Sequence, residues 1–240
     1  MVFITEGMSL RIPAGGLVIP VDGSAVPPVK FEVALDTWRY WLKIATGHVD
    51  NAVTAHEELL AAHAESDDSA KGSALESEFI YSMQGLSASA FSLEAFYASV
   101  DERILPDEEL SKRWAKNRTA RVVRISETLI RAFKITHAGR MVLLKNLEEV
   151  FKFRDYAVHP PARFREPIMH PDLSVGVEWR FIAFTASGSM TATRVALSII
   201  QQCMHAPQSK HEELVKWSQA SVARVDAMVS EWERRHGSLL

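Results

Sequence analysis

The chain lacks a second cysteine, a long apolar run and an excess of positive charge, and each absence excludes a class of protein. Cys203 is the only cysteine, which excludes an internal disulfide framework or a cysteine-based zinc cluster within one chain and favours a reducing cytoplasm. No apolar run approaches the roughly 20 residues that span a bilayer, and the N-terminus lacks the basic region of a secretory signal. We therefore expect a cytoplasmic protein that neither enters a membrane nor is exported.

The charge balance and the histidines narrow the chemistry further. With 27 lysines and arginines against 30 aspartates and glutamates, the net charge of -3 argues against a surface built wholly to hold nucleic acid. His56 and Glu57 begin the zinc-protease helix pattern, but Leu60 stands where its second histidine belongs. No phosphate-binding glycine loop, nucleophile elbow or dinucleotide fingerprint is present. We expect no metal and no cofactor.

The first 30 residues differ in composition from the rest of the chain. Prolines and glycines recur through residues 1–30, and short apolar pieces at 10–12 and 17–19 flank Gly15 and Gly16. This pattern predicts a small hairpin or an extended arm instead of a helix. After the arm we expect a single helical domain over residues 31–240.

Helical periodicity dominates from Phe31 onward. A polar stretch of small residues at 66–73 has nothing to bury, so we expect a flexible connection there. The expected helices run over about 31–65, 75–100, 105–135, 139–158, 189–205 and 208–236. The fold class that follows is mainly α, an up-and-down bundle of five to six helices.

A partly extended insertion is expected at about 160–188, where prolines and glycines interrupt the helical period. Val175, Val177, Trp179, Phe181 and Ala183 follow a two-residue period there, which predicts a strand or short hairpin within about 173–186. Such an element is able to pair with the N-terminal arm. The two segments together would form the small β element of the fold.

The most informative stretch is residues 153–160, FRDYAVHP, at the end of a long amphipathic segment. Arg154 can hold a phosphate in a bidentate grip, and His159 can move a proton near neutral pH. Asp155 lies four residues before His159, one helical turn away, where it can fix the tautomer of the imidazole. On an ideal helix Arg154 and His159 would point about 140° apart, but Pro160 disfavours helical backbone at His159 and frees its ring to swing.

Spacing alone does not single out this pair of residues. Three other arginine–histidine pairs have similar spacings, namely Arg131/His137, Arg163/His170 and Arg165/His170. Only Arg154 is followed at once by a short polar residue and stands with its histidine at the end of an amphipathic helix. The context, and not the spacing, makes residues 153–160 a candidate phosphodiester-cleaving site.

Residues 153–160 resemble the signature of the HEPN superfamily of helical-bundle proteins, in which an arginine, then Asn, Asp or His, then a few residues and a histidine close a long helix. Residues 87–96, a small-residue stretch that carries Glu94 beside aromatics, are similar to the other recurring feature of that superfamily. The helical layout expected over residues 31–158 is compatible with this resemblance. In this sequence Asp155 stands where asparagine is more usual.

The resemblance implies a metal-independent endoribonuclease, often a toxin or a stress or defence effector, with two copies of the motif meeting across a homodimer. Arg154, His159 and Asp155 would be the catalytic residues, with Glu94 and Tyr156 in support. His159 would take a proton from the ribose 2′-OH or give one to the leaving oxygen, and Arg154 would stabilise charge on the scissile phosphate. RNA is then the expected substrate, and an antitoxin or regulatory protein the expected partner.

Each of these residues also has a purely structural interpretation. Cationic side chains near a helix C-terminus, such as Arg154 and His159, complement the helix dipole and cap carbonyls. Glu94 can orient a catalytic arginine or serve as an ordinary buried salt-bridge partner. A second hypothesis therefore stays open, namely a non-catalytic helical interaction or regulatory module that binds a partner protein or a nucleotide.

The basic run offers a candidate RNA-binding surface. Arg118, Arg121 and Arg124 step by three in a stretch with no acid from 111 to 126, and could follow an RNA backbone along one face. Several acids precede the run at 101–109, so mutual neutralisation in a salt-bridged face is the competing explanation.

Overall fold

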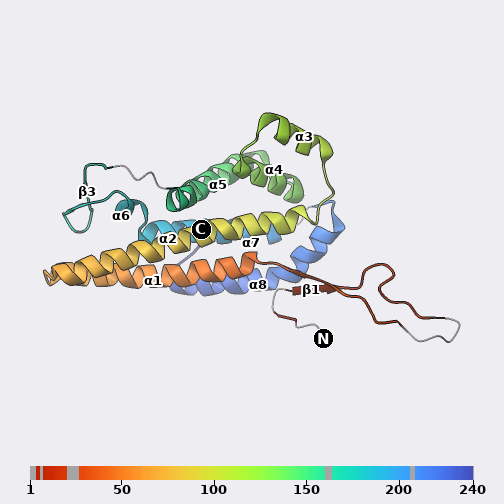
Figure 1. Cartoon of the computed structure of the whole chain (residues 1–240), viewed down its shortest axis with the longest axis horizontal. Coiled ribbons are helices and arrows are strands. Elements are labelled where there is room, and N and C mark those ends of the chain that lie inside the picture. Colours follow the sequence, from red (N-terminus) through yellow and green to blue (C-terminus); the bar gives the residue numbers. More distant parts are fainter. Residues whose placement is uncertain (1–3, 6–7, 21–26, 160–163, 206–208, 240) are drawn as a thin grey trace.

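Two long antiparallel helices joined by a tight turn form the centre of the fold (Figure 1). The computed structural model describes residues 4–5, 8–20, 27–159, 164–205 and 209–239. Helix α1 spans Trp38–Ala64 and helix α2 spans Asp68–Asp101. The connection is shorter than the 66–73 segment expected from sequence, because the Asp67 carboxylate accepts hydrogen bonds from the backbone N–H groups of Ser69 and Ala70 and so starts α2 early.

Two C-terminal helices pack beside this pair and complete a four-helix group. Helix α7 spans Ala186–His205 and helix α8 spans Glu212–His236. Small side chains let α2 and α7 approach closely, and the Ser89 and Thr193 hydroxyls share a buried hydrogen bond of 2.8 Å between them. The polar groups inside this contact are therefore satisfied, as buried hydroxyls require.

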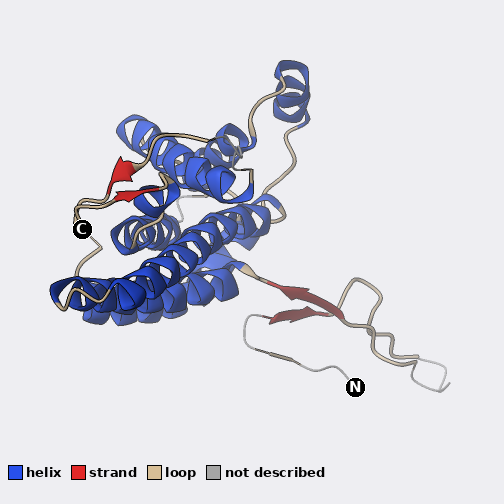
Figure 2. Ribbon diagram, turned by 60° about the vertical axis from the view of Figure 1, so that its left-hand side comes forward, coloured by secondary structure: helices blue, strands red, loops and turns tan. Residues whose placement is uncertain are grey.

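Three further helices lie on the other side of α2 (Figures 1 and 2). Helix α3 spans Glu108–Asn117, helix α4 spans Arg121–Phe133 and helix α5 spans His137–Val158. Arg118 and Lys134 end α3 and α4 in the left-handed conformation, with φ of 49° and 51°. These two stops convert the single helical stretch expected at 105–135 into two helices and bring α5 back along α2.

One apolar core joins both groups of helices. Phe96 on α2 is fully buried and contacts the rings of Trp38, Phe133 and Trp217 with centroids 5.8–6.2 Å apart. The largest fully buried members of this core are Trp38, Leu42, Leu86, Leu93, Phe96, Ile125, Leu129, Leu147, Phe184, Leu197 and Trp232. Helix α2 contributes from both of its sides, which explains why its apolar residues are spread around its circumference.

The N-terminal segment forms an arm that reaches away from the helices (Figure 2). Strand β1, Met8–Arg11, pairs antiparallel with strand β2, Glu32–Leu35, in a register that places Met8 opposite Leu35. The hairpin predicted for the arm is present, but the partner of the first strand is 32–35 and not 17–19. Helix α1 consequently begins at Trp38, later than the predicted start at Phe31.

Buried Asp36 connects the base of the arm to the helices. Its carboxylate accepts hydrogen bonds from the Ser99 hydroxyl at 2.8 Å and the Trp217 indole N–H at 2.7 Å. Arg103 adds an ion pair at 3.3 Å. Because a buried carboxylate must be paired, these contacts fix the residue at which the arm leaves the bundle.

The segment between α5 and α7 departs most from expectation. Strand β3, Ile168–Met169, pairs with strand β4, Gly176–Val177, in a hairpin of its own, and the two-stranded sheet does not include the arm. The residues that alternate after β4 form the short helix α6, Arg180–Ala183, so the predicted strand through 183 is wrong. The cause is that Trp179, Phe181 and Phe184 pack on the helices instead of on a neighbouring strand.

The predicted fold class is confirmed as mainly α with a small hairpin. The described residues form eight helices, more than the five to six expected, because the basic stretch divides in two and α6 is added. None of these helices is both long and apolar enough to cross a membrane.

Candidate functional site

The sequence motif lies at the C-terminal end of α5, where the helix stops at Val158. His159 is the C-cap, and its backbone, with φ of -124° and ψ of 49°, has left the helical region as the following proline predicts. The His159 side chain is exposed and forms no hydrogen bond or ion pair within the described part of the chain. An exposed imidazole without a partner is free to meet a ligand.

Arg154, in contrast, is held on three sides. Its Nε and Nη2 atoms donate to Oδ1 of Asp155 at 3.0 and 2.7 Å, and its Nη1 atom donates to Oε2 of Glu94 at 3.4 Å. The guanidinium carbon lies 4.9 Å from the ring centroid of Phe151. Only 22% of the side chain is exposed. The arginine is therefore preorganised, while about a fifth of its side chain still reaches solvent.

Asp155 occupies a different position from the one expected. Its carboxylate accepts both hydrogen bonds from Arg154, and no hydrogen bond joins it to the His159 ring. Two causes act together: the charged fork of Arg154 is the stronger partner, and the non-helical backbone of His159 removes the one-turn alignment on which the expected contact depends. In this structure Asp155 orients the arginine and not the histidine.

Glu94 on α2 bridges two arginines from different helices. Its Oε2 atom accepts from Arg154 of α5, and its Oε1 atom accepts from Nε of Arg121, the first residue of α4, at 3.1 Å. The Glu94 side chain is 28% exposed and pairs with both arginines. It is therefore a salt-bridge partner, and it also holds Arg154 in a fixed orientation. The single carboxylate fixes the beginning of α4 to the end of α5.

Tyr156 supports the motif by packing of its ring, and its hydroxyl makes no hydrogen bond with the part of the chain that the structure describes. Its ring meets Phe153 on the same helix, and it meets Trp179 edge-on with centroids 5.5 Å apart. Trp179 in turn carries the Arg165 guanidinium at 5.2 Å from its ring centroid. These contacts fasten the end of α5 to the segment before α6.

Trp179 and Arg165 join the site although the sequence does not predict it. The two-residue period predicts Trp179 on a strand, and Arg165 is one of several arginines spaced near a histidine. The sequence feature that could have pointed to these two residues is a tryptophan and an arginine shortly after the motif, in a segment without helical period. Nothing in the sequence showed that this segment folds back on Tyr156.

The three arginines of the basic run do not share one helix face. Arg118 ends α3 in the left-handed conformation, whereas Arg121 and Arg124 lie on α4. Arg121 is taken by Glu94 and by the ring of Tyr97, whose centroid is 4.7 Å away. The predicted row of three phosphate contacts is therefore reduced to Arg118 and Arg124.

The pKa of the Tyr97 phenol is shifted by burial and by the charges near α4. Burial raises the pKa of its phenol, the charge of Asp101 raises it further, and Arg121 and Arg124 act in the opposite direction. The phenol consequently stays protonated and neutral near pH 7, and it offers Arg121 an aromatic face.

In the described residues, no three histidine, cysteine, aspartate or glutamate side chains gather where they could hold a metal ion. No protein-family model, curated protein or solved structure matches the chain. Function is therefore inferred from the residues of the site.

Proposed function

We propose that this protein is a HEPN-like, metal-independent endoribonuclease that acts as a homodimer. The observation that carries the proposal is the end of α5, where a fixed and partly exposed Arg154 stands five residues before an exposed His159 that has no partner among the described residues. A phosphate-holding group and a free proton carrier are the two components that RNA cleavage without a metal requires.

The chemistry is an internal transfer of the phosphoryl group. An imidazole takes the proton of the ribose 2′-OH, the 2′-oxygen bonds to phosphorus, and the bond to the 5′-oxygen breaks as that oxygen receives a proton. The products are a 2′,3′-cyclic phosphate and a 5′-hydroxyl end. Arg154 donates hydrogen bonds to the non-bridging oxygens, whose charge increases in the transition state.

A dimer supplies what one motif lacks. The reaction needs a base and an acid at the same time, whereas His159 is the only histidine within the motif of each chain. Two copies of the motif at one cleft provide two imidazoles and two guanidinium groups. The neutralising Asp155 and Glu94 carboxylates are an added reason for two arginines, since each Arg154 shares its charge with them.

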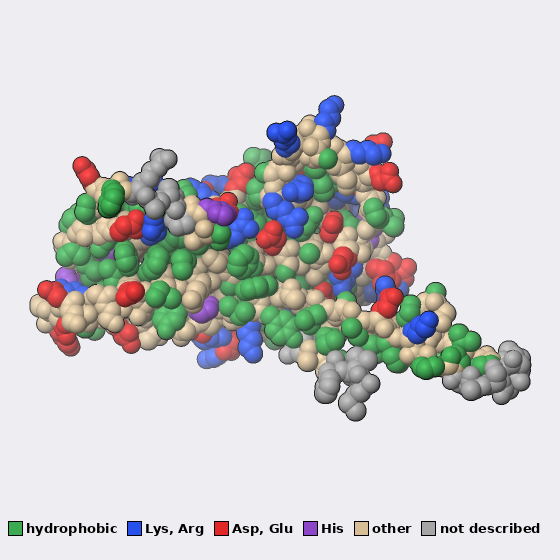
Figure 3. All heavy atoms as spheres, viewed as in Figure 1, with side chains coloured by type: hydrophobic (Ala, Val, Ile, Leu, Met, Phe, Trp, Pro, Cys, Tyr) green, Lys and Arg blue, Asp and Glu red, His purple; other side chains and the backbone are tan. Residues whose placement is uncertain are grey.

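The arm supports a second copy of the chain as the dimer partner. Eight of its large apolar side chains are about half exposed or more: Leu10, Ile12, Leu17, Val18, Ile19, Phe31, Val33 and Leu35. Contact with a second copy of the chain would remove these side chains from water, and an exchange of two arms doubles the apolar area that is buried. Figure 3 shows this apolar surface along the arm.

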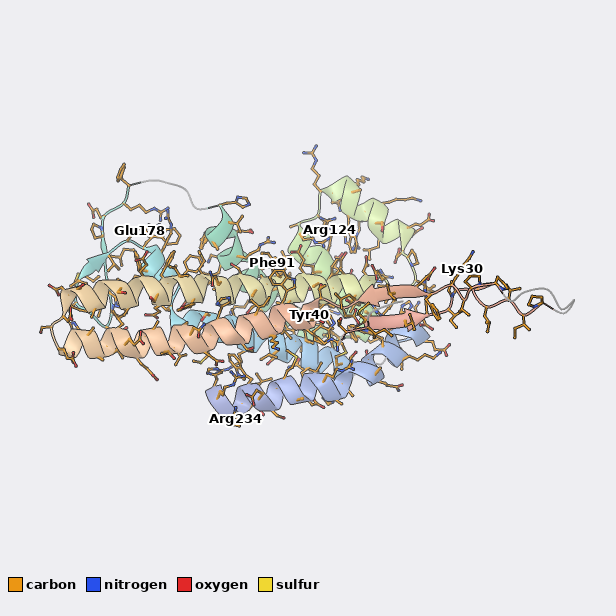
Figure 4. All side chains as sticks on the ribbon, turned by 60° about the horizontal axis from the view of Figure 1, so that its bottom comes forward. Lys30, Tyr40, Phe91, Arg124, Glu178 and Arg234 are labelled. Carbon is orange, nitrogen blue, oxygen red and sulfur yellow. The ribbon has the colours of Figure 1, made fainter. Side chains whose placement is uncertain are left out.

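The receiving surface is the start of α1. Tyr40 and Ile44 are exposed there, and Figure 4 labels Tyr40 near the base of the arm. The arm's Arg11 and Glu32 pair with each other at 2.6 Å, so exposed Lys30 is the one charge of the described arm that stays unbalanced. An apolar, nearly neutral arm beside an apolar patch of the same chain fits an exchange between two copies.

The biological role attached to this activity is that of a toxin or a stress or defence effector in the cytoplasm, controlled by an antitoxin or other regulatory protein. The support is the HEPN resemblance of residues 153–160 and 87–96 and, for the compartment, the single cysteine.

Cleavage of RNA by the purified protein in the presence of a chelator tests the proposal. We expect His159→Ala and Arg154→Ala to lower the cleavage rate at least a hundredfold, with unchanged circular dichroism. His137→Ala is the matched control, because His137 is an exposed histidine at the other end of α5. Loss of activity with chelator, or equal rates for His159→Ala and His137→Ala, would overturn the assignment.

A second candidate function is favoured by one observation, the exposed apolar arm. A non-catalytic regulatory module would use the same eight side chains to bind a different protein, or would bind a nucleotide, without cleaving RNA. This alternative predicts a monomer on its own, no RNA turnover, and partner binding that is indifferent to Arg154→Ala. A purified dimer that cleaves RNA excludes it.

A further inference from the structure

A cavity of about 530 Å³ lies between α3 and the start of α4, outside the Arg154 site. Its lining residues are Ser111, Trp114, Ala115, Arg118, Thr119 and Arg124. Figure 3 shows lysine and arginine side chains gathered over this part of the molecule, and Figure 4 shows Arg124 on the side of α2 that carries α3, opposite to Arg234. The cavity contains two cations and no acid among its walls.

Neither arginine in the wall is neutralised. Arg118 is exposed, and neither its side chain nor that of Arg124 makes a hydrogen bond or ion pair with any residue that the structure describes. The Nε atom of Arg124 is buried and has no partner among the described residues, which leaves it out of reach of a ligand. The donors that the wall offers to an anion are therefore the terminal guanidinium N–H groups of Arg118 and Arg124.

The nearest carboxylate on α4 does not fill this role. Glu127 accepts a hydrogen bond from Nη2 of Arg113 at 2.8 Å, and it also accepts one from the indole N–H of Trp114. These contacts neutralise Glu127 and hold the Trp114 ring in the cavity wall. The positive charge of Arg118 and Arg124 therefore stays uncompensated.

Backbone donors add to these side chains. Helix α4 begins after Ala120 without a side-chain cap, and its first helical backbone bond runs from Arg124 N–H to Ala120 O at 3.2 Å. The N–H groups of the three preceding residues have no partner within the helix. Thr119 lines the cavity two residues before this helix begins, so the positive end of α4 directly follows a segment of the cavity wall.

We infer that this cavity binds a phosphate group of the RNA strand that the Arg154 site cleaves, with Trp114 as the aromatic wall against which a neighbouring base stacks. The inference rests on the proposed function. Arg121 connects the two places, since it begins α4 at the cavity and shares Glu94 with Arg154. Phosphate charge and base stacking are the two elements of single-strand binding that carry no sequence preference.

Binding of an oligonucleotide that cannot be cleaved tests the inference apart from catalysis. A fluorescent 2′-O-methyl RNA oligonucleotide lacks the attacking hydroxyl, so its fluorescence anisotropy measures binding alone. We expect Arg118→Ala and Arg124→Ala each to weaken binding about tenfold, and each to reduce the slope of log K against log salt by about 0.7. Trp114→Leu should weaken binding about fivefold without changing that slope.

Arg131→Ala is the matched control, because Arg131 lies on the same helix but pairs with Asp107 at 3.3 Å. The affinity of the Arg131→Ala variant for the oligonucleotide should stay within about twofold of the wild-type affinity. Arg118→Glu reverses the charge at an exposed position, where the substitution is not expected to disturb folding. It provides a second measurement of oligonucleotide binding. Circular dichroism of every variant shows whether the fold is kept.

The outcomes separate this inference from the proposed function. RNA cleavage together with unchanged oligonucleotide affinity in Arg118→Ala and Arg124→Ala would overturn the cavity and leave the nuclease standing. Weakened binding in both variants, in a protein that never cleaves RNA, would uphold the cavity and overturn the nuclease. Displacement of the oligonucleotide by polyglutamate as readily as by unlabelled RNA of equal charge would overturn the cavity as an RNA site.

Discussion

At the scale of single residues, the central feature is the Glu94 carboxylate between Arg121 and Arg154. An arginine beside two carboxylates loses part of its attraction for phosphate, yet gains a fixed orientation. The HEPN-like assignment requires that orientation to matter more than the lost charge. A substitution that removes the charge of Glu94 and keeps the shape of its side chain tests this requirement.

We expect Glu94→Gln to lower the rate of RNA cleavage by about ten- to hundredfold, because the guanidinium is then no longer held at its distance of 3.4 Å. The loss should appear in kcat more than in KM, and the melting temperature should change little at this partly exposed position. Glu148→Gln provides the control, since Glu148 is an exposed glutamate on α5. Equal rates for both variants would show that Glu94 does not position Arg154.

The sequence was sufficient to bring Arg154 and Glu94 into one hypothesis, because motif context and a glutamate on a small-residue helix are both local signals. The partner of Asp155 was not predictable in the same way. It depends on the backbone of a single residue, His159, and on which of two nearby side chains, Arg154 or His159, the carboxylate meets. Trp179 and Arg165 join the site only through tertiary packing on Tyr156, which no local pattern reports.

At the scale of helices and strands, capping decides where elements begin. Asp67 starts α2 with two backbone hydrogen bonds, although the residues that follow it resemble a loop in composition. We expect Asp67→Ala to cost about 1 kcal/mol of the free energy of unfolding, measured by urea denaturation. Glu65→Ala, at an exposed neighbouring position, should cost much less. Identical midpoints for the two variants would contradict the cap.

Periodicity predicted the existence of the long helices well, because each buries a continuous apolar face against the common core. It failed where tertiary contacts override a short local pattern. Residues 179–183 alternate as a strand would, but burial of Phe181 and Phe184 against Phe79 stabilises a helical turn instead. The partner of β1 was also not predictable, since the sequence pattern predicts residues 32–35 as part of a helix. Only the structure shows that Asp36 is buried and that 32–35 form a strand.

The start of α8 gives the fold a dependence on pH. His211 is buried, and its Nδ1 atom accepts a hydrogen bond from the backbone N–H of Leu105 at 3.2 Å. Burial lowers the pKa of His211 below its ordinary value of 6.5, with smaller contributions from the charges of Lys210 and Arg131. Burial lowers the pKa of His48 as well.

The unfolded chain therefore binds more protons than the folded one below about pH 6.5, and stability should fall as the pH drops through that range. We expect the urea midpoint of the wild type to be lower at about pH 5.5 than at about pH 7. In His211→Gln, which keeps an acceptor but cannot titrate, the difference should shrink. An unchanged difference in this variant would exclude His211 as the cause.

At the scale of the whole molecule, the arm is the part that the single chain does not explain. A two-stranded hairpin is marginal in water on its own, and this one keeps its apolar side chains exposed on the described part of its surface. The arm's base is nevertheless fixed by the Asp36 network, so its direction is set by the bundle. A fixed, apolar arm is suited to a partner of defined geometry.

Replacement of Leu10, Val33 and Leu35 by serine should convert the protein from dimer to monomer in multi-angle light scattering and reduce RNA cleavage at least tenfold, since each motif then lacks its second copy. Met141→Ser, at an exposed apolar residue of α5, should leave both properties unchanged. A triple variant that stays dimeric and active would show that the arm does not join the two chains.

The most direct test of the central claim is the cleavage rate of two matched RNA strands in the presence of a chelator, one all-ribose and one with a single 2′-deoxy sugar at the cleaved position. If Arg154 and His159 catalyse attack by the 2′-oxygen, the ribose strand is cut to a 2′,3′-cyclic phosphate and a 5′-hydroxyl, and the deoxy strand resists at that position. Cleavage of both strands at the same rate, or cleavage of neither until a divalent metal is added, would contradict the proposed function.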